Sequence, residues 1–214
     1  MRKWFKWVLL VLVGLIFIFF IVANNPIVFI PHDHVSITLP FHPKYDSTTG
    51  LIPMGEKFEH PDGDGHPGID FGFQQVTPIL AVADGRVGII RKNQEGSIDL
   101  EISHGFYYKS AYKEMNSLEP NIKFGSKVKQ GQIIGYAGFA GDRAQKFEPG
   151  GPSGQIHWEF SSSSMLIDRL CPVGYFDSDA LTRVNNIWTA VPAHDKFKQN
   201  YPDICSGVYK GRED

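Results

Sequence analysis

The chain lacks the excess of positive charge that a nucleic-acid-binding domain usually carries on one face. Its 214 residues include 21 basic and 23 acidic side chains, for a formal net charge of −2. Disorder is also disfavoured, because 42% of the residues are apolar and 13% are aromatic. At this length one folded domain with a short additional segment is the default expectation. The composition therefore predicts a single globular domain that does not bind nucleic acid.

Cysteine is scarce, since the chain contains only Cys171 and Cys205. Two cysteines fit an oxidising compartment, where they would pair. A bond between them would close a loop of about 35 residues, for which the chain-entropy model gives ~3–4 kcal/mol of stabilisation. Two unpaired thiols are the alternative, and the sequence alone leaves both open.

Lysine and arginine are absent between Lys6 and Lys44, and this stretch contains the longest apolar run of the chain, residues 7–23. A helix of that length measures about 26 Å, which is at the short end of what a bilayer core requires. We therefore predict that residues 1–24 form a signal anchor, which is a single-pass transmembrane helix.

The charges beside this run predict its orientation. Arg2, Lys3 and Lys6 precede it, so the positive-inside rule places the N-terminus in the cytoplasm and the rest of the chain outside. A cleaved signal peptide is one alternative, although Ile21-Val-Ala23 is a poor small-x-small cleavage site. A buried core helix is the other, and it would need the whole run to lack a polar face. Either membrane-targeting interpretation predicts an exported domain.

Long amphipathic helical patterns are missing from the exported part, where short β-like runs are interrupted by glycines. The Asp84-Gly85 pair between two apolar runs is a typical β-hairpin signal. Strands that recur without intervening helices favour antiparallel pairing. The predicted fold class is therefore mainly β, with a single antiparallel β-sheet domain. The candidate strands are residues 79–83, 86–90, 97–102, 106–112, 133–137 and 155–160.

Changes in composition predict the domain boundaries. The anchor at 1–24 precedes a stalk or linker at 25–51, which is rich in Pro, Thr, Ser and His. An alternating stretch at 35–39 makes an edge strand the alternative for part of this linker. The β domain is predicted at 52–175. A C-terminal extension at 176–214 is expected to pack on the domain and to contain one short helix near 180–186.

Histidine and aspartate occur in a pattern that suits a metal ion. His66 and Asp70 are four residues apart in a Gly-rich segment that disfavours a helix, and an extended chain places such residues on one face. His157 lies on an alternating stretch that puts Gln155 and Glu159 on its own face. Imidazole and carboxylate are both zinc ligands, and three protein ligands leave the open fourth position of a catalytic site. Taken singly, each cluster is more often a turn or an ordinary strand.

Five segments, in order, resemble lysostaphin-type (LytM-like) zinc metallopeptidases. His66-Pro-Gly-Ile-Asp70 is similar to the family's HxxxD motif, and Gly154-Gln-Ile-His157 to its closing HLHFE segment. Residues 81–87, 102–105 and 128–135 resemble the family's AxADGxV, IxHG and VxxGQxIG segments.

The resemblance covers residues 52–160. It implies one Zn²⁺ held by His66, Asp70 and His157 in an antiparallel β fold that cleaves peptides of bacterial peptidoglycan. The membrane would then be the bacterial inner (cytoplasmic) membrane, with the domain in the periplasm or extracytoplasmic space.

Two histidines that assist the chemistry in this family are missing, since no histidine occurs between His104 and His157. The resemblance aligns one of these positions with Glu114 and the other with Gln155. Amide hydrolysis at zinc needs a proton acceptor and a donor to the developing oxyanion. Glu114 could accept the proton and Gln155 could donate an amide N–H, although Gln155 cannot act as a base. Alternatively, Glu114 could close the site as a fourth ligand, or simply face solvent.

Two functions are consistent with these residues. In the first, the protein is a membrane-anchored zinc metalloendopeptidase that acts on cell-wall peptidoglycan peptides, with Glu114 and Gln155 in place of the usual histidine pair. In the second, the domain is catalytically degenerate and binds peptidoglycan or regulates another cell-wall hydrolase. The three apparent ligands favour the first function, and the two missing histidines favour the second.

Three further residues are candidates for supporting roles. Glu159 could orient a ligand imidazole, or form an ordinary ion pair. His60 precedes the ligand segment and could touch substrate, although a plain turn is as good an interpretation. Tyr112 could hydrogen-bond substrate near the metal, or pack in the core or on the surface.

Overall fold

The computed structural model describes residues 2–23, 35–61, 65–75, 77–92, 96–138, 154–162 and 169–205. Within these ranges the helices are α1 (Arg2–Ala23), α2 (Ser178–Ala190) and α3 (Lys196–Asn200), with 3-10 turns η1 (Pro43–Thr48) and η3 (Pro172–Gly174). The strands are β1 (Gly50–Ile52), β2 (Ile69–Phe73), β3 (Pro78–Leu80), β4 (Gly85–Lys92), β5 (Ile98–His104), β6 (Tyr108–Leu118), β7 (Lys127–Val128), β8 (Ile133–Ala137) and β9 (Gly154–Ser162).

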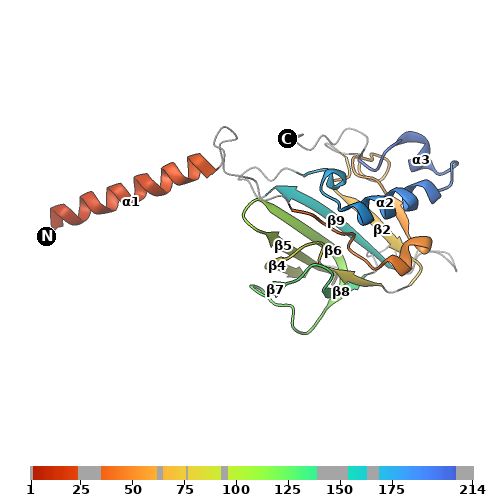
Figure 1. The fold of residues 1–214 in the computed structure, drawn as a ribbon, viewed down its shortest axis with the longest axis horizontal. Helices are drawn as coiled ribbons and strands as arrows, with labels where there is room; N and C mark the ends of the chain where they lie inside the picture. The colour runs from red at the N-terminus through yellow and green to blue at the C-terminus, as the bar shows by residue number, and fades with distance from the viewer. Residues whose placement is uncertain are drawn as a thin grey trace.

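An antiparallel sheet dominates the fold (Figure 1). Its main path runs β1-β2-β9-β6-β5-β4-β7, and β8 pairs with both β3 and β6. The long strands β6 and β9 lie at its centre, paired from Tyr108 opposite Ser162 to Lys113 opposite His157. Every pair of named strands is antiparallel. The predicted mainly β, antiparallel class is confirmed.

The core lies against one face of this sheet. Alternate residues of β9 supply buried apolar side chains, Ile156, Trp158 and Phe160. Phe71 of β2 packs edge to face with Phe41, which precedes η1, and their ring centroids are 5.0 Å apart. Such aromatic contacts add to the free energy gained from burying apolar area.

The segment that we predicted as a stalk contributes to this core in its described part, 35–51. Ile37, Leu39 and Phe41 are fully buried, and Ile37 forms a parallel bridge with Phe176. These residues therefore belong to the packed domain, because their alternation buries one side of the segment. Residues 25–34 of the predicted stalk lie outside the described residues.

The hairpin predicted at Asp84-Gly85 was wrong. Strand β3 pairs with β8, whereas β4 pairs with β5 and β7, so the two strands that flank Asp84 are not partners. Gly85 does not adopt the positive φ of a type I′ turn. Instead, the Asp84 carboxylate accepts the Gln130 backbone N–H at 2.9 Å. Asp84 therefore ties the β3–β4 connection to the turn before β8.

The C-terminal extension packs beside η1 and β1 through α2 (Figure 1). Asp177 caps this helix by accepting the Ala180 N–H at 2.7 Å, and the apolar stripe of the helix is buried, namely Ala180, Val184, Ile187 and Trp188. The predicted helix at 180–186 lies inside α2, which is longer at both ends. Cys171 and Cys205 form a disulfide with their Cα atoms 5.8 Å apart.

The N-terminal segment folds as helix α1. Among the residues that the structure describes, no helix combines the length and the apolar character needed to cross a membrane.

Candidate metal centre

Three side chains converge at the pairing of β2 with β9. Asp70 and His157 occupy directly opposite positions in this ladder, and His66 lies just before β2. His157 Nδ1 is 2.7 Å from Asp70 Oδ1. His66 Nε2 is 3.1 Å from the same oxygen and 3.0 Å from His157 Nδ1. The structure thus brings together the three ligands that the resemblance implies, and all three side chains are buried.

The outer nitrogen of each ring has a partner that can only accept a hydrogen bond from it. His66 Nδ1 is 3.0 Å from the Pro53 carbonyl oxygen, and His157 Nε2 is 3.0 Å from the Glu159 carboxylate. Each ring therefore donates an N–H outward, and its other nitrogen, which faces Asp70, is the atom that can coordinate a metal. All three converging atoms can coordinate a metal, so a cation bound here would take the place of the proton between His157 Nδ1 and Asp70.

The charges of the centre follow from burial and hydrogen bonding. Burial raises the pKa of Asp70, but hydrogen bonds to His157 and His66 outweigh it and hold the pKa well below its usual range. Burial lowers the pKa of His157, whereas its bonds to Asp70 and Glu159 raise it to about 9. Burial raises the pKa of Glu159, but His157 and Lys113 lower it to about 2. Both carboxylates are therefore ionised at neutral pH.

The donor set fits zinc. Two imidazoles and one carboxylate make up a His₂Asp set, and three protein ligands with an open position are typical of catalytic zinc. Ligand atoms of a tetrahedral zinc site lie about 3.3 Å apart, so these three atoms need to separate by only a few tenths of an ångström. His66, Asp70 and His157 would hold the ion.

Glu114 and Gln155 bind each other. Gln155 Nε2 donates to Glu114 Oε2 at 2.5 Å, and Gln155 lies two residues from His157 on the same strand. Among the described residues, the metal-ligating atoms that lie within 4.8 Å of one another at this centre belong to His66, Asp70 and His157 and not to Glu114. The structure therefore shows a Glu–Gln pair beside the centre rather than a fourth ligand.

The backbone of Glu114 explains how its side chain reaches the site. Its φ is +65°, in the left-handed region that favours glycine. Strict alternation would send Glu114 to the same side as Tyr112, but the positive φ breaks the alternation of β6.

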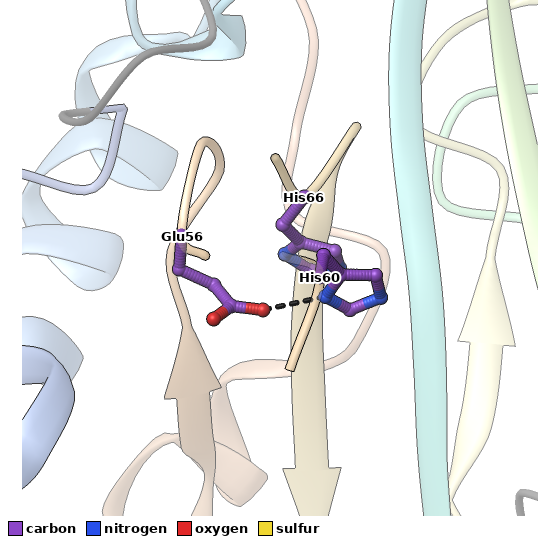
Figure 2. A group of neighbouring side chains, drawn as sticks. All are labelled: Glu56, His60 and His66. Carbon is purple, nitrogen blue, oxygen red and sulfur yellow. Dashed lines mark hydrogen bonds and ion pairs between the residues drawn. The ribbon is translucent and has the colours of Figure 1, made fainter. Parts of the chain in front are cut away.

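A second pair of side chains lies against His66 (Figure 2). Glu56 Oε1 is 2.5 Å from His60 Nδ1, and the His60 ring stacks on His66 with centroids 4.4 Å apart and an interplanar angle of 22°. The other Glu56 oxygen accepts backbone N–H groups of Phe58 and Glu59. Burial raises the pKa of Glu56, but the bond to His60 and these backbone bonds lower it below its usual value.

The stacking decides what this pair can do. Lone pairs of imidazole lie in the ring plane, so two nearly parallel rings do not aim them at one point between the rings. The Glu56–His60 pair is therefore a hydrogen-bonded carboxylate–imidazole dyad rather than a second metal site. His60, for which we considered substrate contact or a plain turn, is thus fixed against a ligand. Glu56 was not found from the sequence, and its spacing of four residues from His60 was the available signal.

Tyr112 packs in the core, which is one of the roles that we considered for it, and not near the substrate. It is fully buried, and its hydroxyl accepts the Val82 backbone N–H at 2.9 Å. Its burial raises the pKa of the phenol to about 12. Residues 108, 110 and 112 of β6 face the core, whereas Lys113 faces the metal centre opposite His157.

Glu159 combines both of the roles that we considered for it. Its Oε1 contacts His157 Nε2 and the Lys113 ammonium. Its Oε2 lies 2.6 Å from Arg169 Nε. The carboxylate is only 2% exposed, so the two cations stabilise a buried charge that in turn orients a ligand ring.

The C-terminal extension holds the loop that carries Glu56 and His60. Tyr201 accepts the Lys57 backbone N–H through its hydroxyl at 2.8 Å, and its ring packs edge to face on Phe58. The Met54 N–H donates to the Ile204 carbonyl at 2.9 Å. This support reaches the site from residues that are distant in the sequence.

Comparison with known proteins identifies related domains. Residues 64–169 match Peptidase family M23. The peptidoglycan DD-endopeptidase ShyB of Vibrio cholerae is 34% identical over 76 residues, which are 36% of this chain and 17% of that protein. The glycyl-glycine endopeptidase ALE-1 of Staphylococcus capitis is 31% identical over 86 residues, 37% of this chain and 22% of that protein. The chain thus spans about a fifth of these relatives.

A solved structure supports the fold. A chain of the SpoIIQ–SpoIIIAH pore-forming complex has a TM-score of 0.52 and 16% identity, and the match covers 72% of this chain and 98% of that one. At this identity the similarity concerns the arrangement of the strands.

Proposed function

Because residues 64–169 form a domain of peptidase family M23, we propose that the protein is a zinc-dependent endopeptidase that acts on the peptides of bacterial peptidoglycan. The observation that carries the proposal is the convergence of His66 Nε2, Asp70 Oδ1 and His157 Nδ1, with both rings oriented from outside. ShyB is a peptidoglycan DD-endopeptidase and ALE-1 a glycyl-glycine endopeptidase, and these peptide-bond cleavages support the same reaction class for this chain.

Bound zinc would acidify a water molecule and polarise the scissile carbonyl. The chain must then supply a proton acceptor and a donor to the developing oxyanion. We assign the acceptor to the Glu114 carboxylate and the donor to the Gln155 amide. An amide has two N–H groups, so Gln155 can keep one on Glu114 while the other serves the substrate.

The Glu56–His60 dyad provides a second candidate for the proton acceptor. His60 donates through Nδ1 to Glu56, which leaves the lone pair of Nε2 on the opposite side of the ring. A carboxylate that fixes the tautomer of an imidazole in this way is a recurring device for general bases. Glu114 and His60 can therefore be compared in one experiment.

The test measures zinc content and digestion of purified peptidoglycan for the full chain and for His157→Ala, Glu114→Gln and His60→Gln. We expect one zinc per chain in the wild type and its loss in His157→Ala. Glu114→Gln should retain zinc and lose about 10²-fold or more in rate. If His60→Gln instead shows this loss, the dyad is the acceptor. A wild type without zinc would overturn the proposed site.

The Glu114–Gln155 bond also favours a second candidate function. Glu114 and Gln155 hydrogen-bond each other next to the ligands, so they offer a substrate fewer proton acceptors and hydrogen-bond donors than two unpaired histidines would. In this function the domain binds zinc and peptidoglycan, or contacts another cell-wall hydrolase, without cleaving a bond. The similarly folded chain comes from a complex with another protein, which supports protein contact as a use of this fold. Zinc binding with no digestion by the wild type would select this function.

We propose the bacterial cytoplasmic membrane as the location, with the N-terminus inside and the domain outside. The support is the apolar run at 7–23 with its preceding positive charges. A Cys171–Cys205 disulfide is consistent with an oxidising, extracytoplasmic compartment. Retention of the full chain in membranes after alkaline extraction is the expected result, and release would contradict it.

A further inference from the structure

A charged cavity lies beside the metal centre on the solvent-facing side of the sheet. Its volume is about 360 Å³, which is within the range of pockets that hold small ligands. Residues of strands β4, β5, β6 and β9 line it, and these strands are neighbours in the sheet (Figure 1). Arg169, which follows β9 in the chain, contributes to its lining.

The strand register places this cavity next to the ligands. Lys113 lines the cavity and sits directly opposite the ligand His157 in the β6–β9 ladder. Glu159, also in the lining, hydrogen-bonds His157. Cross-strand neighbours have Cβ atoms about 5 Å apart, so a peptide bound at the metal centre can extend one residue into the cavity.

The cavity is deepest at Ala111, because the side chain of this lining residue is only a methyl group. This residue lies between Lys109 and Lys113 on β6 and opposite Glu159 on β9. Its methyl group leaves the space that the longer neighbouring side chains surround. The cavity therefore depends on a small residue at one position, which offers a way to fill it without changing any charge.

The lining carries more cations than carboxylates. The cations are Arg91, Lys109, Lys113 and Arg169, and the carboxylates are Asp99, Glu101 and Glu159. Asp99 is directly opposite Arg91 in the β4–β5 ladder. Glu159 is occupied on both oxygens, by Lys113 and His157 on one and by Arg169 on the other.

Unused hydrogen-bond donors are therefore in surplus. An ammonium has three N–H donors and a guanidinium has five, so Lys113 and Arg169 retain donors after binding Glu159. Within the described part of the chain, Lys109 takes part in no ion pair. A donor-rich cavity of net positive charge suits a ligand that brings its own acceptors and a negative charge.

We propose that this cavity binds a free carboxylate of the peptide substrate, in the residue next to the scissile bond. The inference rests on the proposed function, since it names the chemistry of the substrate for the same site. Lys109 and Lys113 contact the carboxylate, and Ala111 provides the room for the side chain that carries it. The domain thereby selects acidic peptides over neutral ones.

The test uses two soluble peptidoglycan stem-peptide fragments that differ only in their side-chain carboxylates, which are free in one and amidated in the other. Binding to the full chain is measured by calorimetry, and the same samples are then analysed for cleavage products. We expect amidation to weaken binding about tenfold or more, because a charge-assisted hydrogen bond is lost. Raising the salt concentration should weaken binding of the free-carboxylate fragment more than binding of the amidated one.

Variants connect the effect to the cavity. Lys109→Met should remove most of the preference for the free carboxylate, and Ala111→Leu should abolish binding of both fragments. Lys123→Met is the matched control, because Lys123 is exposed and outside the cavity lining, and it should leave binding unchanged. Circular dichroism checks that each variant is folded.

The outcomes separate the two proposals. Selective binding without cleavage would support the carboxylate cavity and reject the peptidase. Cleavage of both fragments at equal affinity would support the peptidase and overturn the carboxylate cavity. An unchanged preference in Lys109→Met would also overturn it.

Discussion

Glu159 is the residue that connects the metal centre to the charged cavity. It accepts the N–H of His157 and is flanked by Lys113 and Arg169. Its carboxylate fixes the His157 tautomer that turns Nδ1 toward Asp70, and this orientation is what a metal ion requires. A neutral residue here would disturb both the ligand and the two cations.

Glu159→Gln should lower zinc affinity by about 10–100-fold, the usual cost of removing such an outer partner of a ligand histidine. The measurement is competition for zinc against a chromophoric chelator. Glu119→Gln provides the control, since Glu119 follows β6 outside the centre, and it should leave the affinity unchanged. Equal zinc affinity in wild type and Glu159→Gln would show that His157 does not need this orientation.

At the residue scale, the sequence predicts those site residues that can be identified from residue type and spacing alone or by resemblance. The family resemblance implies His66, Asp70 and His157 as ligands, and the four-residue step and the strand alternation are consistent with this set because each places side chains on one face without reference to distant structure. Alternation alone puts Tyr112 on the same face as Glu114, and only the +65° φ of Glu114 separates the two. Such a break in alternation has no signature in a non-glycine sequence. Glu56 was missed because its role depends on how a loop folds over His66.

At the element scale, the β2–β9 pairing builds the centre, and Gly68 lets the chain enter β2. A Cβ atom at Gly68 would lie 2.4 Å from the Trp158 carbonyl oxygen, which is a backbone atom in a central strand. Neither strand can move away without disturbing the Asp70–His157 register. The close approach of the two backbones therefore requires glycine between the first two ligands.

Gly68→Ala should destabilise the fold by about 1–3 kcal/mol or more, because overpacking against backbone cannot be relieved by a rotamer change. Thermal unfolding followed by circular dichroism measures this loss, and zinc affinity should fall with it. Gly174→Ala is the matched control, since no heavy atom lies within 4 Å of its added Cβ. Equal losses in the two variants would mean that the close approach at Gly68 has no special cost.

The strands themselves follow from local pattern, but their partners do not. Apolar alternation is sufficient to place β6, β8 and β9 near their observed positions. The Asp84-Gly85 pair does not form a hairpin because the Asp84 carboxylate instead accepts hydrogen bonds from the Lys129 ammonium and the Gln130 backbone N–H, which lie in a turn about 45 residues further along the chain. Hydrogen bonds between residues so far apart in the sequence depend on the tertiary structure, and a local sequence pattern does not predict them.

At the scale of the whole molecule, the segments before and after the sheet complete the site. The described part of the predicted stalk fills the core through Ile37 and Phe41. The C-terminal extension supports the Glu56–His60 loop through Tyr201 and the Ile204 carbonyl. Residue 204 immediately precedes Cys205, so the disulfide to Cys171 tethers the segment that supports the loop.

Opening the disulfide should therefore have a global and a local effect. In the chain-entropy model a loop of about 35 residues corresponds to ~3–4 kcal/mol of unfolding free energy, and a Cys171→Ser/Cys205→Ser variant should lose about this much in chemical denaturation. Backbone amides that the extension holds, those of Met54 and Lys57, should lose hydrogen-exchange protection at denaturant-free conditions before β6 and β9 do. Dithiothreitol should reproduce both effects in the wild type and change nothing further in the double variant. Uniform loss of protection across loop and sheet would instead show that the disulfide stabilises the domain as one unit, without a particular hold on the loop beside the metal centre.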